Sequence, residues 1–218
     1  MIKGVIFDFD GLILDTETAW YHAFKKVLQS QFQFELPLEE FVKSVGSDDK
    51  QFYPYLQKEL GNQLNIADIQ NQAANLHTEY IRNEKAREGV NDYLQAAKEA
   101  GLAIALATSS HTSWATSHLN NLNLLSYFDH VVTKDMVDRV KPAPDLFLKA
   151  LEKLELESHE AVVFEDSLNG LIAAQEINIP TVIVPNPVTA SLPFENYHLK
   201  LNSMADMPLQ EVIKTLHK

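Results

Sequence analysis

The sequence predicts an α/β protein with a doubly wound (Rossmann-like) parallel-sheet core and an inserted helical-bundle cap. Three observations carry this prediction. A short apolar run that ends in carboxylates opens the chain, a purely helical pattern covers residues 17–85, and strand and helix patterns alternate from residue 90 onward. Such alternation is typical of a parallel sheet with helices on both faces. Because the helical stretch separates the first strand from the others, we expect it to be an insertion.

The first strand is expected over residues 4–9, where apolar, β-branched and aromatic residues precede carboxylates. The inserted stretch shows apolar residues at helical spacing, interrupted by turn-forming proline and glycine. It predicts helices over residues 17–31, 38–46, 50–60 and 66–83. We expect large side chains of this stretch to form its own core rather than a substrate site, namely Trp20, Phe24, Phe41 and Phe52.

The alternating part predicts strands over residues 102–107, 129–133, 161–165 and 180–184. It predicts helices over residues 90–100, 112–124, 144–155, 167–177 and 206–217. The chain should cross between the two units near residues 11–17 and 84–90. This assigns residues 1–14 and 88–218 to the catalytic core and residues 15–87 to the cap.

Composition excludes several classes of function. The chain of 218 residues has no cysteine, which excludes disulfides, thiolate metal sites and cysteine nucleophiles. Its formal net charge of −12 argues against nucleic acid or an anionic membrane as partner. The opening apolar run is too short for a signal peptide, and no run approaches the roughly 20 apolar residues of a membrane span. We therefore expect a cytoplasmic protein, and a monomer because the cap already covers the site.

Binding sites in parallel sheets lie beyond the carboxyl ends of the strands. There the sequence places carboxylates, hydroxyls and one amine: Asp8, Asp10, Thr108, Ser109, Ser110, Lys141, Glu165, Asp166 and Ser167. The convergence of these groups at one edge predicts a functional site. The eight histidines include no i, i+4 pair, so a histidine zinc site is not expected.

The carboxylates of Asp8 and Asp10 would repel one another unless a cation lay between them. Mg²⁺ prefers carboxylate, carbonyl and phosphate oxygens, and Asp166 is placed to complete such a site. One carboxylate can attack phosphorus while a second protonates the leaving oxygen. Lys141 would offset the negative charge, and Thr108 would hold phosphate oxygens. The sequence thus predicts magnesium-dependent phosphoryl transfer from a small phosphorylated metabolite.

Four motifs in order carry a family resemblance. They are Asp8-Phe9-Asp10-Gly11-Leu12 with Asp15-Thr16-Glu17, then Thr108, then Lys141 within Val140-Lys141-Pro142-Ala143-Pro144-Asp145, and finally Glu165-Asp166-Ser167-Leu168-Asn169-Gly170. This set resembles the haloacid dehalogenase (HAD) superfamily. With the helical insertion after the first motif, it is similar to the β-phosphoglucomutase-like phosphatase branch.

The resemblance implies a HAD-type phosphoric monoester hydrolase and a role for each matched residue. Asp8 is the implied nucleophile and metal ligand, and Asp10 the general acid/base whose backbone carbonyl also binds Mg²⁺. Thr108 binds the phosphoryl group, which Lys141 holds against the nucleophile, and Ser109 beside Thr108 is a further candidate for phosphate binding. Asp166 ligates the metal directly, and Glu165 supports it directly or through water. Asp10 argues against a dehalogenase, because members that cleave carbon–halogen bonds usually lack this aspartate.

The cap departs from the mutases of this branch. Their phosphate-gripping arginine is absent from residues 45–50, where Ser47 is the nearest match and Lys50 a further possible substrate contact. Trp20 stands where the mutases have a histidine. Both departures favour a phosphatase. A sugar phosphomutase, which returns the phosphate to a sugar instead of to water, stays the alternative within the family. A non-catalytic regulatory or binding module is the alternative from another class.

Some candidate residues also have purely structural interpretations. Asp15 and Thr16 are expected to cap the first helix of the insertion, and Ser167 and Asn169 the helix after residue 166. Glu165 is also placed to interact with that helix dipole. Ser109, Ser110 and His111 are contact candidates or plain loop residues, and Trp114 is expected to pack between helix and sheet.

Overall fold

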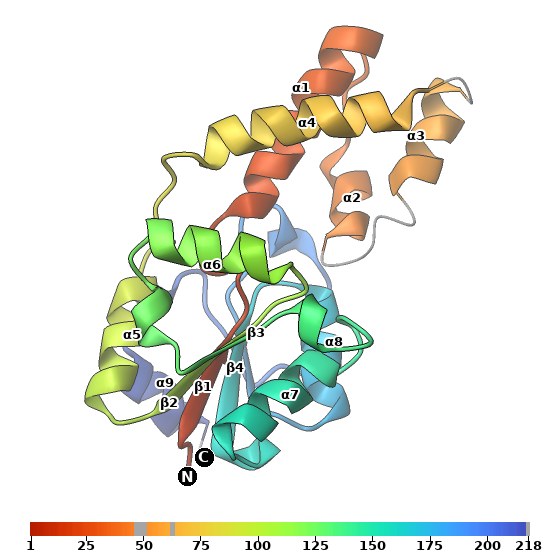
Figure 1. The fold of residues 1–218 in the computed structure, drawn as a ribbon. Helices are drawn as coiled ribbons and strands as arrows, with labels where there is room; N and C mark the ends of the chain where they lie inside the picture. Colours follow the sequence, from red (N-terminus) through yellow and green to blue (C-terminus); the bar gives the residue numbers. More distant parts are fainter. Residues whose placement is uncertain (46–51, 62–63, 217–218) are drawn as a thin grey trace.

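The computed structural model describes residues 1–45, 52–61 and 64–216. Its centre is a parallel sheet with strand order β3-β2-β1-β4-β5-β6 (Figure 1). The strands are β1 (Gly4–Phe7), β2 (Ala103–Ala107), β3 (His130–Val132), β4 (Ala161–Glu165), β5 (Thr181–Ile183) and β6 (Leu199–Lys200). The predicted doubly wound α/β fold is confirmed. Strand β6, with two residues, is too short to leave a hydrophobic period in the sequence and was not predicted.

Helices cover both faces of the sheet, because side chains of a strand alternate between its faces. Val5 and Phe7 of β1 pack in one buried cluster with α5 (Val90–Glu99), α6 (Thr112–Asn121) and α9 (Leu209–Thr215). Ile6, between them, belongs to a second cluster with α7 (Asp145–Leu154) and α8 (Leu168–Glu176). Strands buried on both faces explain the nearly continuous apolar runs seen in the sequence.

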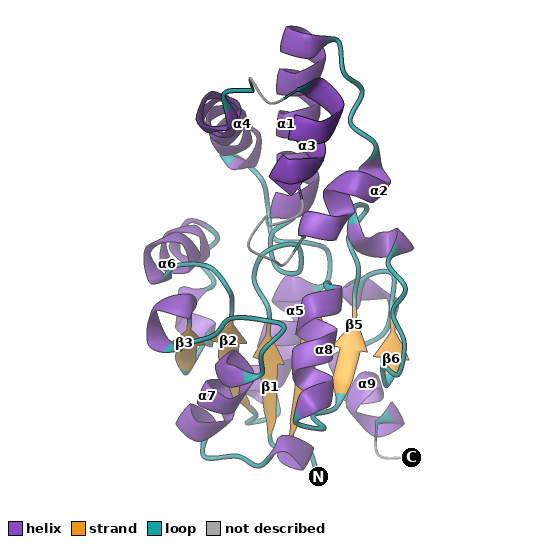
Figure 2. Cartoon of the chain, turned by 90° about the vertical axis from the view of Figure 1, so that its right-hand side faces the viewer, coloured by secondary structure: helices purple, strands orange, loops and turns teal. Residues whose placement is uncertain are grey.

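In the described part of the chain, four α-helices lie between the first strand and α5 in sequence. They are α1 (Thr16–Phe32), α2 (Leu38–Phe41), α3 (Phe52–Leu60) and α4 (Ile66–Ile81). Figure 2 shows these helices beyond the end of the sheet toward which the strand arrows point. They share a hydrophobic cluster that includes Phe24, Phe41 and Phe52 as predicted, and Val188 from the segment after β5 also belongs to it. The helix predicted over residues 38–46 is instead the short α2 followed by a 3-10 turn at Val42–Ser44.

The N-terminus of α1 lies close to the carboxyl edge of the sheet. The Oδ1 atom of Asp15 accepts a hydrogen bond of 3.1 Å from the backbone N–H of Thr18, so the predicted capping role of Asp15 is confirmed. The chain leaves β1 through a turn at Gly11, whose φ of 81° favours glycine. A Cβ at Gly11 would also collide with the Asp166 carboxylate and the Asn186 amide.

The return crossing is held by a residue that sequence reasoning did not single out. Arg87 Nη1 donates to the carbonyls of Gly11 at 2.5 Å and Val184 at 3.0 Å, and Nη2 donates to Pro185 O at 2.7 Å. Arg87 therefore joins the loops after β1 and β5. Among the described residues, no helix is long and apolar enough to cross a membrane.

Candidate active site

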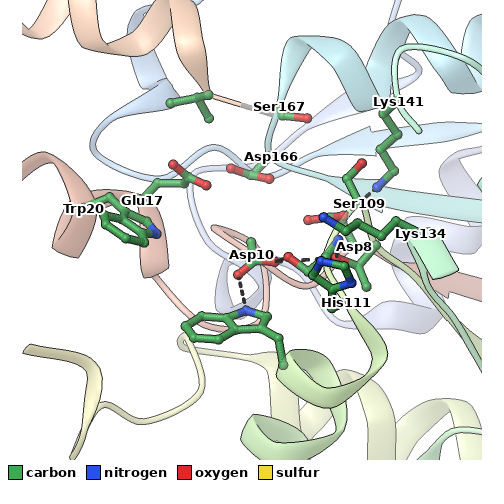
Figure 3. Close-up of a pocket in the computed structure, with 14 residues that line it drawn as sticks. Asp8, Asp10, Glu17, Trp20, Ser109, His111, Lys134, Lys141, Asp166 and Ser167 are labelled. Atoms are coloured by element: carbon green, nitrogen blue, oxygen red, sulfur yellow. Dashed lines mark hydrogen bonds and ion pairs between the residues drawn. The ribbon is translucent and has the colours of Figure 1, made fainter. Parts of the chain in front are cut away.

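A cavity of about 370 Å³ lies at the carboxyl edge of the sheet, where strand-end residues and Glu17 and Trp20 of α1 line it. Figure 3 shows Glu17 and Trp20 on one side of this pocket and Lys134 and His111 on the other. The strand ends supply most of the remaining lining: Asp8, Asp10, Thr108, Ser109, Ser110, Lys141, Asp166 and Ser167. The residues predicted from the strand ends are thus brought together, with the exception of Glu165, which lies directly behind the pocket wall.

Lys141 joins two buried carboxylates. Its Nζ lies 2.5 Å from Asp8 Oδ1 and 2.5 Å from Glu165 Oε1, and it also donates to Ala107 O at 2.8 Å. The side chains of this trio are 3%, 9% and 0% exposed for Lys141, Asp8 and Glu165. Lys141 is therefore a buried member of the site, as predicted, and not a solvent-exposed loop residue. Buried charges require partners of this kind, because removing one partner leaves the other charge uncompensated.

Burial and crowding of negative charge dominate the titration of this centre. Burial raises the pKa of Asp8 to about 8, against the opposing effect of Lys141 and with further increases from Glu165 and Asp10. Burial also raises the pKa of Asp166 well above its usual value, assisted by Glu165 and Asp8. Burial alone would lower the pKa of Lys141, but the charges of Asp8 and Glu165 raise it. The centre therefore holds more carboxyl groups than the charge of Lys141 alone keeps ionised near neutral pH.

Glu165 is fixed by the start of helix α8. Its Oε2 accepts hydrogen bonds from Asp166 N at 3.0 Å and from Ser167 N at 3.0 Å and Oγ at 2.9 Å. Ser167 Oγ in turn accepts from Gly170 N at 3.0 Å, which confirms its predicted capping role. Both oxygens of Glu165 are thus engaged, one by Lys141 and one by these donors. This geometry favours the supporting role over direct metal ligation.

Asp166 presents an oxygen that the described protein leaves unsatisfied. Its Oδ2 accepts from Asn186 Nδ2 at 2.7 Å, whereas Oδ1 is buried and has no hydrogen-bond partner in the described part of the chain. Carboxylate oxygens of Asp8, Glu165 and Asp166 lie within 4.8 Å of one another. Excess buried carboxylate with an unpartnered oxygen fits a hard divalent cation such as Mg²⁺.

Asp10 is held by four side-chain donors. Its Oδ1 accepts from Thr16 Oγ1 at 3.1 Å and Trp114 Nε1 at 2.9 Å. Its Oδ2 accepts from Ser110 Oγ at 2.6 Å and, at 3.5 Å, from Thr108 Oγ1. Thr16 therefore contacts the site in addition to beginning α1. Ser110 also contacts it, which supports its prediction as a contact residue.

The loop after β2 provides hydroxyl groups next to Asp10. Thr108 Oγ1 accepts a hydrogen bond from Ser110 N at 3.0 Å, which fixes the turn. Ser109 Oγ is buried and lacks a hydrogen-bond partner among the described residues. An unpartnered hydroxyl in the pocket wall is a ready donor to an anionic ligand. This arrangement suits the predicted phosphate-binding role of Thr108 and Ser109.

The structure corrects two expectations about tryptophans. Trp114 does pack on the core cluster beside the sheet, but its indole N–H also contacts Asp10. Trp20 packs on the cap cluster and lines the pocket as well. Helical periodicity locates the buried face of a helix but not the direction of a polar atom at the end of a large side chain. The two possible cap contacts Ser47 and Lys50 lie outside the described residues.

Asn186 and Lys134 complete the site and were missed. Asn186 follows β5, and Lys134 follows β3 and lines the pocket. Both stand just beyond predicted strands, so the strand-end argument, applied to every strand, would have found them. The ammonium group of Lys134 forms no ion pair within the described ranges, whereas the neighbouring His111 Nδ1 lies 2.7 Å from Asp135 Oδ1.

Comparison with known proteins places this geometry in a family. The haloacid dehalogenase-like hydrolase family matches residues 5–184. YhcW of Bacillus subtilis (strain 168), named as a candidate phosphatase, is 42% identical over 100% of this chain and 99% of its own. The phosphorylated carbohydrates phosphatase of Thermotoga maritima is 33% identical, over 83% of this chain and 84% of its own.

A solved structure shares both fold and detectable sequence. A mutant of CbbY from Rhodobacter sphaeroides, in complex with xylulose-(1,5)bisphosphate, is 26% identical and has a TM-score of 0.73. The match covers 94% of this chain and 96% of that chain. These relatives confirm the predicted resemblance and the predicted enzyme class, a phosphoric monoester hydrolase. The chain belongs to the haloacid dehalogenase-like hydrolase family, in its β-phosphoglucomutase-like branch.

Proposed function

We propose that this protein is a magnesium-dependent phosphatase that hydrolyses a small phosphomonoester, preferably a sugar phosphate, through a phospho-Asp8 intermediate. The observation that carries the proposal is the meeting of three buried groups at one point of the pocket. Lys141 holds Asp8 at 2.5 Å, and Asp166 beside them has one oxygen without a hydrogen-bond partner among the residues that the structure describes. A nucleophile, a cation and a vacant ligand atom are what phosphoryl transfer requires.

Asp8 and Asp166 would hold Mg²⁺ with their carboxylates, and Asp10 with its backbone carbonyl. Glu165 would support the site through Lys141 and the start of α8. The bound ion would supply charge that shields the phosphoryl oxygens and keeps Asp8 ionised. This agrees with the raised pKa of Asp8, about 8 in the metal-free chain, because an added positive charge favours the carboxylate.

The first half-reaction transfers the phosphoryl group to Asp8. A carboxylate oxygen of Asp8 forms a bond to phosphorus as the bond from phosphorus to the substrate oxygen breaks. Asp10, in its protonated form, gives its proton to that leaving oxygen, and the alcohol departs. Lys141 and the hydroxyls of Thr108 and Ser109 offset the charge on the phosphoryl oxygens.

The second half-reaction returns the enzyme to its starting state. Asp10, now ionised, takes a proton from water as the water oxygen attacks phosphorus. The bond between phosphorus and the Asp8 oxygen breaks, which releases inorganic phosphate and restores the Asp8 carboxylate. The donors around Asp10 hold its carboxylate on the pocket side of the β1 turn.

Residues 15–87 are proposed to act as the cap over a core of residues 1–14 and 88–218. Glu17, Trp20 and Val45 from this segment line the pocket above the catalytic groups. An aromatic face and a carboxylate opposite a phosphate site suit a polyhydroxylated substrate, which stacks on rings and donates hydroxyl hydrogens. The Thermotoga maritima relative named for phosphorylated carbohydrates supports the same substrate class.

The test is phosphate release from a panel of phosphomonoesters, including sugar phosphates, with and without Mg²⁺. We expect magnesium-dependent release that Asp8→Asn abolishes. Asp92→Asn, on the exposed side of α5, makes the same change of charge away from the pocket and should leave release unchanged. Release that persists in Asp8→Asn would contradict the proposed nucleophile.

The same preparation separates the alternatives. Conversion of β-glucose 1-phosphate to the 6-phosphate in the presence of a bisphosphate primer, without net phosphate release, would identify a mutase. No turnover of any kind across the panel would favour a non-catalytic module. Net release of inorganic phosphate supports the phosphatase.

A further inference from the structure

Trp114 connects the proposed acid/base residue with the helices above the sheet. Its indole Nε1 donates to Asp10 Oδ1 at 2.9 Å. The other donor to that oxygen is Thr16 Oγ1, at the first residue of α1. One oxygen of Asp10 is therefore held from α6 on the core side and from α1 on the other side.

The face of the Trp114 indole continues into a stack of aromatic rings. His77 of α4 lies 5.7 Å from Trp114 with an interplanar angle of 26°, and 3.9 Å from Trp20 of α1 with an angle of 12°. His118, one turn along α6 from Trp114, contacts the indole edge-on at 4.2 Å. The stack thus joins α1 and α4 to α6, next to the pocket that Trp20 lines.

His77 acts on its neighbours through packing and not through charge, because its ring is buried and neutral. Its side chain is 1% exposed, and its Nε2 has no hydrogen-bond partner in the described chain. Burial lowers the pKa of His77 to about 4, while a hydrogen bond to the Thr16 backbone raises this pKa and the neighbouring His118 lowers it further. The ring is therefore neutral at physiological pH. A neutral ring between two indoles favours close, flat packing, which fixes the two tryptophans relative to each other.

We propose that Trp114 is a positioning residue for the Asp10 carboxylate and that His77 and Trp20 tie its orientation to the helices α1 and α4. The proposal rests on the proposed function, in which Asp10 moves protons. Trp114 contacts both Asp10 and His77 of α4. The position of the Asp10 carboxylate therefore depends on the position of α1 and α4 over the pocket. If Trp114 only filled space, its ring would be needed but its indole N–H would not.

The first test removes the N–H and keeps a ring. Trp114→Phe should lower kcat about tenfold, because a misdirected acid/base group loses part of its contribution. KM should stay within about twofold, since Asp10 acts after the substrate is bound. Tyr93→Phe is the matched control: it removes the 2.7 Å hydrogen bond from the Tyr93 hydroxyl to Met207 O, in the core away from the pocket, and should leave kcat unchanged.

A second pair of variants tests the stack. His77→Leu removes the ring and should reproduce the loss of kcat, whereas His77→Phe keeps a ring between the indoles and should hold kcat within about twofold of wild type. Wild-type kcat in Trp114→Phe or in His77→Leu would overturn the proposal. A loss in His77→Phe as large as in His77→Leu would overturn the role of stacking.

A readout independent of turnover comes from fluorescence, because the two tryptophans of the chain are both in the stack. In Trp20→Phe the emission reports on Trp114 alone. Asp10→Ala and His77→Leu, each in this background, should shift that emission, and unchanged emission in both would overturn the proposed contacts. A wild-type protein that releases no phosphate would instead contradict the proposed function, so the two failures are distinguishable.

Discussion

The carboxylate of Glu165 occupies the space that any side chain at Gly170 would enter, since a Cβ there would overlap its carboxyl group. Gly170 lies in the first turn of α8, and Glu165 ends β4. The close approach lets Glu165 turn back against the helix start while its other oxygen contacts Lys141. The position of Lys141, and through it of Asp8, thus depends on a glycine outside the pocket.

Gly170→Ala should therefore destabilise the protein and slow the reaction. Alanine normally stabilises a helix relative to glycine by up to about 1 kcal/mol. At Gly170 the overlap with Glu165 makes alanine destabilising instead. We expect a loss of about 1–3 kcal/mol in the free energy of unfolding. Urea denaturation measures the loss, and phosphate release at saturating substrate should fall with it. A Gly170→Ala protein that is more stable than wild type would contradict the packing described.

Without bound metal, the protein should lose the stabilisation due to Asp8 as pH rises from 3.8, the pKa of an unperturbed Asp, to about 8, its pKa in the folded state. The folded state holds a proton on Asp8, whose pKa is raised to about 8 by burial, whereas the unfolded chain has already released it. A carboxyl group whose pKa is higher in the folded state contributes its whole stabilising free energy below its pKa in the unfolded chain. This contribution is lost as the pH rises through the pKa of the folded state. Thermal unfolding without metal should show the decline, and Asp8→Asn should reduce it.

Mg²⁺ should oppose this decline. Because the ion binds ionised carboxylates of the folded state, it should raise the unfolding temperature more at about pH 8 than at about pH 6. Thermal unfolding at both pH values, with and without Mg²⁺, makes the comparison. An increase that is larger at the lower pH would contradict the assignment of Asp8 and Asp166 to the metal.

Asn186→Ala should weaken the response to Mg²⁺. The Asn186 amide holds Asp166 Oδ2, whereas Oδ1 accepts no hydrogen bond from any described residue. Loss of such an orienting contact typically lowers metal affinity about 10–100-fold. The Mg²⁺ concentration for half-maximal phosphate release should rise accordingly. Thr189→Val is the control: it removes the acceptor for Asn186 N in the same loop and spares the contact to Asp166.

Lys134→Gln should raise KM for an anionic substrate several-fold while changing kcat less. Lys134 lines the pocket opposite Glu17 and Trp20, where its charge attracts a phosphomonoester. Lys153→Gln removes the same charge from an exposed position of α7 and should leave KM unchanged. Equal values of KM in the two variants would argue against a role for Lys134 in substrate binding.

Much of the fold could be predicted because each core strand is buried on both faces. Residues 161–165 were predicted as a strand with the bounds that the structure shows for β4. The apolar run at residues 4–9 was predicted two residues too long, because Phe9 is also buried although the strand ends at Phe7. Hydrophobicity records burial, whereas strand ends depend on backbone pairing that side-chain pattern does not encode.

The sequence predicted which residues form the site better than it predicted the contacts between their side chains. Asp8, Lys141 and Asp166 follow from the rule that parallel strands deliver functional groups at their carboxyl ends. The contact between Trp114 and Asp10 joins residues 104 positions apart and depends on how α6 packs on the sheet. For Glu165 the sequence left two interpretations, support of the metal and interaction with the start of α8. It does not show which groups a buried carboxylate contacts.

Arg87 locates the pivot of any rotation of the helices α1–α4 relative to the sheet. Its guanidinium clamps carbonyls of Gly11, Val184 and Pro185, so the backbone at residue 87 is fixed to the loops that surround the catalytic carboxylates. The torsions that take up such a rotation must therefore lie before Arg87, in residues 82–86, and at the start of α1. A rotation of this kind would leave the backbone of the loop that bears Asp8 and Asp10 in place, because Arg87 holds the carbonyl of Gly11 next to it.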